Sequence, residues 1–226
     1  MLNGGDGIDT VSYAAATAGI KVSLALTTAQ VTGGAGSDTL SAIENITGSA
    51  LADTLTGGTG NNIINGGNGN DVIDGGNGND TINGGAGNNI LKGGAGNDTL
   101  VGSTGADLLT GGAGKDVLTG GTGNDRFIYL LKTDGVVGAN ADRITDLAAG
   151  DILDLSAIDA NATTAGVNDT FVQVGAFSGV AGQFTLAFAA ETNTTTLLGD
   201  TDGNGVADFS VVFTGDVTAL TANWVL

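Results

Sequence analysis

The chain has 226 residues, and its 24 acidic and 6 basic side chains give it a net charge of −18. A chain this acidic repels phosphate groups, which excludes nucleic-acid binding and anionic membrane surfaces, and no apolar run is long enough to span a bilayer. Cysteine and histidine are absent, which excludes disulfides, thiolate metal sites, histidine-ligated zinc and histidine acid–base catalysis. Many carboxylates held close together do attract hard cations such as Ca²⁺.

Residues 1–47 are expected to form irregular β coils that cap a repeat array. The phrases "GGDGIDTVS" (4–12) and "GGAGSDTLS" (33–41) are outlying copies of the repeat that follows them. They make Asp9 and Asp38 candidate cation ligands.

The same segment contains a strand signal but no export signal. "IKVSLAL" (20–26) alternates apolar and polar residues, as a half-buried strand does. "MLNGGDGIDT" (1–10) has no basic region followed by an apolar stretch, so it is not a cleavable signal peptide. Any export therefore has to use another signal.

Residues 48–128 repeat a nine-residue phrase. Its first position is always glycine, from Gly48 to Gly120, and its eighth is always large and apolar, from Leu55 to Phe127. Glycine at this density rules out a helix, whereas a short strand with one inward apolar side chain and a glycine-rich turn repeats naturally at this period. We expect the strand at positions seven to nine and the turn at positions one to six. The sixth position is always aspartate or asparagine: Asp53, Asn62, Asp71, Asp80, Asn89, Asp98, Asp107, Asp116 and Asp125.

Two such units close one coil of a solenoid, so equivalent positions should stack every second unit, about 4.8 Å apart. The sixth positions then form two columns. Carboxylates this close repel one another unless a cation lies between them. One edge is expected to hold Asp53, Asp71, Asn89, Asp107 and Asp125, and the other Asn62, Asp80, Asp98 and Asp116.

Backbone carbonyl oxygens of the turns are further candidate ligands, because Ca²⁺ takes six to eight oxygens in a flexible cage. Asn62 and Asn89 keep a ligand oxygen but lose the charge, so sites that include them should bind more weakly. The candidate glycines are Gly57, Gly66, Gly69, Gly75, Gly78, Gly84, Gly87, Gly93, Gly96, Gly111 and Gly114.

The phrase G-G-x-G-x-D-x-U-x, in which U is large and apolar, resembles the nonapeptide repeat of RTX (repeats-in-toxin) proteins. The resemblance covers residues 48–128. It implies an all-β fold, a right-handed parallel β-roll (β-solenoid), that binds several Ca²⁺ ions and folds when it binds them. The alternative is a solenoid held together by packing alone, in which the aspartates have no role.

Residues 129–226 leave the period. "DRITDLAAGDILDLSAID" (142–159) resembles the segment after the repeats in serralysin-type proteases and related type I secreted proteins. The resemblance implies a β-sandwich-like C-terminal cap and an uncleaved export signal near the C-terminus, recognised by a type I secretion apparatus. "QFTLAF" (183–188) and "DFSVVF" (208–213) alternate as strands do. The C-terminal end is also consistent with a simple closing edge strand.

A second acidic cluster lies in "DTDGNGVAD" (200–208). Asp200, Asp202, Asn204 and Asp208 occupy positions 1, 3, 5 and 9 of an EF-hand-like loop. Val211 stands where the EF-hand glutamate belongs, so this is not an EF-hand. Two interpretations remain: a Ca²⁺-binding hairpin loop, or a polar turn built from aspartate and glycine.

No catalytic motif is present, and we expect no enzymatic activity in this chain. The leading hypothesis is a calcium-binding module of a larger protein, secreted and extracellular and possibly associated with the cell surface. The alternative is a self-standing extracellular structural protein that self-associates into a surface layer, matrix or filament. A polysaccharide-binding module is a third hypothesis, for which the 4% aromatic content is low.

Overall fold

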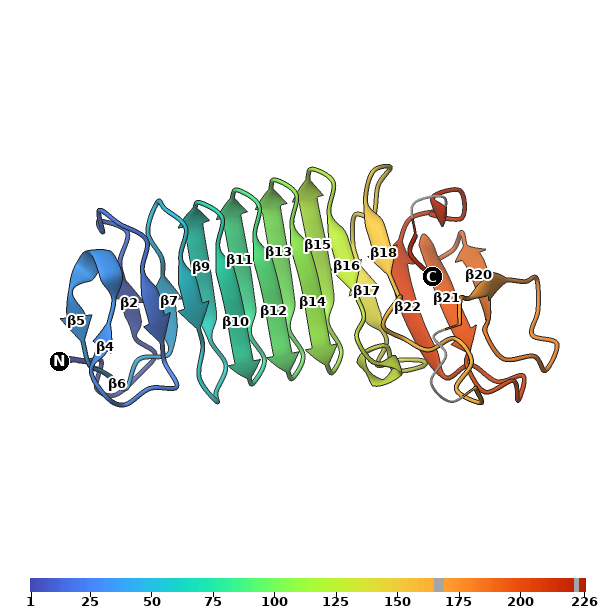
Figure 1. Cartoon of the computed structure of the whole chain (residues 1–226), viewed down its shortest axis with the longest axis horizontal. Helices are drawn as coiled ribbons and strands as arrows, with labels where there is room; N and C mark the ends of the chain where they lie inside the picture. The colour runs from blue at the N-terminus through green and yellow to red at the C-terminus, as the bar shows by residue number, and fades with distance from the viewer. Residues whose placement is uncertain (165–168, 222–223) are drawn as a thin grey trace.

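The computed structural model describes residues 1–164, 169–221 and 224–226. These residues contain no α-helix and form an elongated stack of strands, with the N-terminus at one end and the C-terminal strands at the other (Figure 1). Two 3₁₀-helices, η1 (Gly33–Ala35) and η2 (Lys132–Asp134), interrupt the strands.

Two large sheets form the body. One has seven strands in the order β18-β16-β14-β12-β10-β8-β3, and the other has eleven in the order β19-β20-β21-β22-β17-β15-β13-β11-β9-β7-β2. Successive strands of the array alternate between the sheets. The strands of the array are β7 (Asn45–Thr47), β8 (Thr54–Thr56), β9 (Ile63–Asn68), β10 (Val72–Asn77), β11 (Thr81–Ala86), β12 (Ile90–Ala95), β13 (Thr99–Thr104), β14 (Leu108–Ala113), β15 (Val117–Thr122) and β16 (Arg126–Ile128).

The register confirms the coil of two units. Val72 on β10 pairs with Ile90 on β12, and Thr81 on β11 pairs with Thr99 on β13, all in parallel strands. Each partner lies two units further along the chain. The expected parallel β-roll is therefore confirmed.

The eighth positions form the core of the roll, as predicted. Each is buried between the sheets, because alternate side chains of a strand point to opposite faces. The same row continues past the repeats through Ile144 on β17 (Asp142–Ile144) and Leu153 on β18 (Ile152–Asp154). The buried row within the repeats consists of Leu55, Ile64, Ile73, Ile82, Leu91, Leu100, Leu109, Leu118 and Phe127.

The strands are longer than expected. From β9 to β15 each strand has six residues and includes the first three positions of the next unit, so only positions four to six form the turn. Glycine at the second position bends the chain without ending the pairing, with φ of +92° at Gly85 and +114° at Gly94. Ser103 occupies the same position with φ of +83°, a conformation that side chains other than glycine rarely adopt.

The two outlying repeats behave differently. In the first, β2 (Thr10–Ser12) pairs with β7 and extends the roll. In the second, the glycines form η1, and β5 (Ser37–Asp38) pairs antiparallel with β4 (Gln30–Val31). Its strand β6 (Leu40–Ser41) pairs parallel with β1 (Leu2–Asn3) in a separate two-stranded sheet, so this copy stacks outside the two large sheets of the roll.

The remaining N-terminal strands are short. The strand expected at 20–26 is limited to β3 (Lys21–Ser23), which pairs with β8. β1 (Leu2–Asn3) pairs with β6 (Leu40–Ser41).

Both strands predicted in the C-terminal region are present. β20 (Gln183–Ala189), β21 (Thr194–Asp200) and β22 (Phe209–Thr214) form an antiparallel meander that continues the eleven-stranded sheet through β17. β19 (Val172–Gln173) pairs with β20 at its edge. The expected β-sandwich-like cap is not confirmed, because these strands extend a sheet of the roll.

Aromatic side chains pack the end of this meander. Trp224 stacks on Phe213 with ring centroids 5.7 Å apart and lies 6.3 Å from Phe184. The adjacent Val225 donates its N–H to the carbonyl of Leu153 at 2.9 Å. The last residues of the chain are thus part of the folded end of the roll.

Candidate metal centre

The sixth positions form two columns of buried side chains along the edges of the roll. Every one of the nine is at most 4% exposed. One oxygen of each side chain from Asp71 onward accepts the N–H of the sixth residue one coil earlier. The Oδ1 of Asp98 accepts from Asp80 at 2.7 Å, and the Oδ1 of Asp116 accepts from Asp98 at 2.8 Å. The 18-residue spacing therefore brings these side chains together as predicted.

The second oxygen is what makes the columns unusual. Six of these aspartates have a buried Oδ2 with no hydrogen-bond partner among the residues that the structure describes, and we call these atoms the free carboxylate oxygens. Burying an ionised carboxylate without a partner costs roughly several kcal/mol, unless a bound cation compensates the charge. The six belong to Asp71, Asp80, Asp98, Asp107, Asp116 and Asp125.

The pKa values of these carboxyls show the same cost. Burial, as the largest cause, raises the pKa of Asp98 to about 7 and those of Asp71, Asp116 and Asp125 to about 6. Neighbouring aspartates add to the increase at Asp98, where the charges of Asp116 and Asp80 both act. The columns therefore disfavour their own negative charge when no cation is bound.

Backbone oxygens share the space with the free carboxylate oxygens. A Cβ on Gly93, at the first position, would lie 2.3 Å from Oδ2 of Asp98 and 2.6 Å from the carbonyl oxygen of Gly111. Glycine is required here because any side chain would fill this space. A cradle of carboxylate and carbonyl oxygens, without nitrogen or sulfur ligands, suits Ca²⁺.

The first sixth-position side chain of each column, Asp53 on one edge and Asn62 on the other, lacks a free oxygen. Asp53 accepts the N–H of Ser49 on Oδ2 at 2.6 Å, and the Ser49 hydroxyl and the Ile20 N–H on Oδ1, both at 2.8 Å. Asn62 accepts the N–H of Gly58 at 2.7 Å and donates its amide to the carbonyl of Glu44 at 2.6 Å. Both side chains are fully used by the protein: Asp53 because the unit at 48–56 has serine where the second glycine belongs, and Asn62 because its amide nitrogen is a donor.

Asn89 also differs from the expectation. Its Oδ1 already accepts the N–H of Asp71 at 3.0 Å, as the Oδ1 of each aspartate from Asp71 onward accepts the N–H of the sixth residue one coil earlier. Its Nδ2 takes the place of the free oxygen and donates to the carbonyl of Gly87 at 3.2 Å. An amide N–H cannot ligate a cation, and here it also occupies a carbonyl that would be a ligand.

The aspartates of the two outlying repeats, Asp9 and Asp38, differ in their surroundings. Asp9 has a buried Oδ2 without a partner in the described part of the chain, and a Cβ on Gly4 would lie 2.6 Å from it. Asp38 lies outside both columns and accepts hydrogen bonds from Tyr13 at 3.2 Å and Thr32 at 3.3 Å. Asp38 therefore does not share the geometry of the column side chains, and its role as a cation ligand stays a prediction.

The loop at 200–208 brings three carboxylates together. Asp200, Asp202 and Asp208 place one oxygen each within 4.8 Å of the others. Both oxygens of Asp200 are used by loop N–H groups, those of Gly203 at 2.8 Å and Gly205 at 2.9 Å. Asn204 donates its amide to Asp202 at 3.0 Å. This loop satisfies its acids internally, so it fits a polar turn at least as well as a metal loop.

Sequence reasoning missed a second ladder, formed by asparagines at the fifth position. The Oδ1 of Asn61 accepts the N–H of Asn79 at 2.8 Å, and that of Asn79 accepts from Asn97 at 2.8 Å. Here the acceptor belongs to the earlier coil, whereas in the aspartate columns it belongs to the later one. The recurrence of asparagine just before the sixth position was the signal for this ladder.

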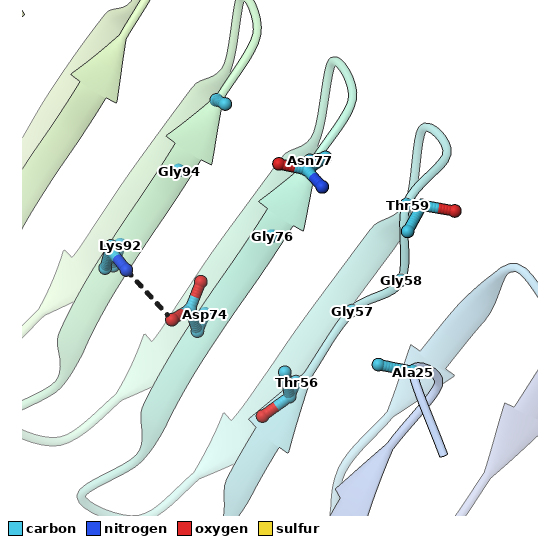
Figure 2. A pocket seen from close by; sticks show the side chains of 11 residues that line it. Ala25, Thr56, Gly57, Gly58, Thr59, Asp74, Gly76, Asn77, Lys92 and Gly94 are labelled. Atoms are coloured by element: carbon cyan, nitrogen blue, oxygen red, sulfur yellow. Dashed lines mark hydrogen bonds and ion pairs between the residues drawn. The ribbon is translucent and has the colours of Figure 1, made fainter. Parts of the chain in front are cut away.

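A hollow on the surface of the seven-stranded sheet, lined in part by Thr56, Asp74 and Lys92, carries no comparable cluster of acidic side chains. Figure 2 shows Lys92 reaching Asp74 across adjacent strands, at 3.2 Å, with Thr56 and Asn77 nearby. Both members of this ion pair are solvent-exposed, so it contributes little stability, about 0–1 kcal/mol.

No helix in the described ranges is long and apolar enough to cross a membrane.

Comparison with known proteins agrees with this geometry. The family model of the RTX calcium-binding nonapeptide repeat (4 copies) matches residues 47–82, 74–109 and 92–127. Metallopeptidase AprA of Pseudomonas marginalis is 44% identical over 90 residues, which are 39% of this chain and 17% of that protein. The chain thus spans about a sixth of the relative's length.

Two solved structures are also similar, both of subunits of the Azotobacter vinelandii mannuronan C5-epimerase and both 27% identical to this chain. The AlgE6R2 subunit has a TM-score of 0.42 over 79% of this chain and 90% of that one. The AlgE6R3 subunit has a TM-score of 0.37 over 77% and 78%.

The family match falls on the segment that carries both columns. Its repeats, the parallel β-roll and the oxygen cradles agree with one another, and residues 47–127 carry the RTX calcium-binding nonapeptide repeat.

Proposed function

We propose that this chain is a calcium-dependent folding module of an exported protein, unfolded where calcium is scarce and folded outside the cell. The observation that carries the proposal is the set of six free carboxylate oxygens in a chain of net charge −18. Without a cation these groups oppose folding, and with one they become ligands.

Linkage gives the size of the effect. A ligand that binds only the folded state stabilises it by about 2.7 kcal/mol per site at a concentration one hundred times its dissociation constant. Several sites in one cooperative array add their contributions. A change from a calcium-poor to a calcium-rich compartment is then sufficient to switch the roll from unfolded to folded.

Export by a type I secretion apparatus is the second part of the proposal. It is supported by the similarity to a segment of metallopeptidase AprA and by the resemblance of the region after Asp142 to type I secreted proteins. We place the signal in the C-terminal residues. Catalysis is not part of the proposed function, because the repeats are structural calcium-binding modules.

Self-association outside the cell is the second candidate function, and one observation favours it. Val72, Ile90 and Leu108 stack in register on the outer face of the seven-stranded sheet, and each is more than a third exposed. A stripe of this kind suits contact between rolls. Sedimentation of the calcium-loaded chain distinguishes the two: a concentration-dependent oligomer that Ile90→Lys abolishes favours assembly.

Calcium should control the folding of the roll. We expect the metal-free chain to lack the β spectrum in circular dichroism and to gain it on titration with millimolar Ca²⁺, because the columns require a cation. Mg²⁺ should be far less effective, since it demands a small, regular octahedral shell. A β spectrum that persists in excess chelator, or an equal response to Mg²⁺, contradicts the proposal.

In the absence of calcium, lowering the pH should stabilise the roll. The pKa of Asp98 is raised to about 7, and those of Asp116 and Asp125 to about 6, from the ordinary 3.8. The folded chain therefore binds protons more tightly than the unfolded chain, and the free energy of unfolding falls as the pH rises through this range. The β signal of the metal-free protein in circular dichroism should therefore be larger at about pH 5 than at about pH 8. A β signal that grows as the pH rises overturns the prediction.

Asn89→Asp should strengthen calcium binding in the middle of the array. The change replaces the Nδ2 donor by an oxygen and adds a charge, so the calcium concentration at half-folding should fall by roughly a few-fold to tenfold. Asp98→Asn should raise it by a similar factor. Asn88→Asp is the matched control, because it adds the same charge on an exposed neighbour that only accepts the N–H of Ala106. Isothermal titration of all three decides, and equal isotherms for Asn89→Asp and Asn88→Asp refute the assignment.

Export should depend on the C-terminal residues rather than on their packing. A chain that ends at Asp216 loses both the proposed signal and Trp224, whereas Trp224→Ala loses only the stacking on Phe213. We expect a host with a type I exporter to secrete Trp224→Ala, with reduced thermal stability, and to retain the truncated chain. Secretion of the truncated chain at the wild-type level contradicts a C-terminal signal.

A further inference from the structure

The column that contains Asp80, Asp98 and Asp116 does not end with the nonapeptide repeats. The Oδ1 of Asp142 accepts the N–H of Asp116 at 2.7 Å, which is the bond that Asp116 itself makes with Asp98. On β17, Arg143 pairs with Val117 and Ile144 with Leu118. Asp142 therefore occupies the sixth position of a further unit.

An insertion hides this unit in the sequence. Asp142 follows Asp116 by 26 residues, whereas rungs within the array are separated by 18. The additional residues form the segment around η2, after which the chain returns to the column. The family match ends at residue 127 and does not include this rung.

Asp142 also shares the second property of the column aspartates, a buried Oδ2 without a hydrogen-bond partner. It is 0% exposed, and its Oδ2 has no hydrogen-bond partner within residues 1–164, 169–221 and 224–226. Burial, as the largest cause, raises the pKa of its carboxyl to about 8, and the charges of Asp116 and Asp134 add to the increase. The carboxylate is thus deeply buried beside other acids with one oxygen unused.

The inserted segment places a further oxygen at the same point. Tyr129 is buried, and its hydroxyl approaches the carboxyl of Asp142 without reaching the geometry of a full hydrogen bond. Burial, then the charge of Asp142 and this side-chain contact, raise the pKa of the Tyr129 hydroxyl well above its ordinary value. The phenol therefore lies close to the unused carboxylate.

The other edge of the roll ends differently. Asp151 continues that column by accepting the N–H of Asp125 on Oδ1 at 2.9 Å. Its Oδ2 accepts the N–H of Ala148 at 2.8 Å, so both of its oxygens are used. Asp151 closes its edge with protein contacts alone, and Asp142 does not.

We propose that Asp142, with Asp116, forms a further calcium site beyond the nonapeptide repeats. The inference rests on the proposed calcium binding of the roll and adds a site that the repeat pattern does not contain. Because Asp142 pairs with Val211 and Ile144 with Phe213, the ion lies where the roll joins the C-terminal meander. Its ligation ties the two parts together.

The number of bound ions tests the proposal. Calcium per chain, measured by elemental analysis of the full chain after removal of unbound ion, should be one ion lower for Asp142→Asn than for the wild type. Asp151→Asn is the matched control and should keep the wild-type number, and Asp98→Asn should lose an ion from the array. An unchanged number for Asp142→Asn, alongside a loss for Asp98→Asn, overturns the site. A wild type that binds no calcium overturns the proposed function itself.

Terbium luminescence provides a second measurement that does not depend on the folding of Asp142→Asn. Tb³⁺ replaces Ca²⁺ in oxygen sites and emits when a nearby tyrosine is excited, so Tyr129 should sensitise an ion at Asp142. Tyr129→Phe should lose this emission while the bound calcium number stays at the wild-type value. Emission unchanged by Tyr129→Phe contradicts an ion beside Asp142.

Discussion

The structure depends on one hydrogen bond, repeated along each edge of the roll: a buried aspartate oxygen that accepts a backbone N–H one coil earlier. It holds coils in register and fixes each carboxylate inside the turn. The geometry engages one oxygen and leaves the other to be satisfied by something outside the chain. Burial of the eighth positions gives the roll its core, but this bond determines that the folded state carries an unmet requirement for positive charge.

Much of this was predictable because the repeat has a strict period. The inward row of Leu55 and its equivalents and the 18-residue stacking follow from strand geometry and turn length. The length of the strands was not predictable, because a glycine at positive φ reads as a turn residue even where the ladder continues through it. Asp38 shows a second limit: its local phrase is correct, but the phrase does not encode that Asp38 accepts hydrogen bonds from Tyr13 and Thr32 and not a backbone N–H one coil earlier.

The sequence was sufficient to predict that the sixth-position side chains form two columns. It was not sufficient to predict the role of each side chain within a column. Asn89 looked like a weak ligand because its oxygen was counted, whereas that oxygen is used by the backbone and the nitrogen faces the cradle. Asp53 looked like a full ligand, but Ser49 satisfies it. Asp142 was invisible because an insertion breaks the period before it. In all three cases the deciding fact is a partner elsewhere in the chain, which a position-by-position reading does not contain.

The two side-chain ladders run in opposite senses, and this has a consequence for how the roll assembles. A lone coil satisfies neither its aspartate rung, which needs the coil before it, nor its asparagine rung, which needs the coil after it. The smallest unit with any completed rung is a pair of neighbouring coils, and each coil added to that pair completes rungs of both kinds at one boundary. Such an array behaves as a one-dimensional chain with an unfavourable nucleus and favourable propagation. Partly formed rolls are then rare. The molecule passes cooperatively between its unfolded and folded states, and folding spreads from a single pair of neighbouring coils.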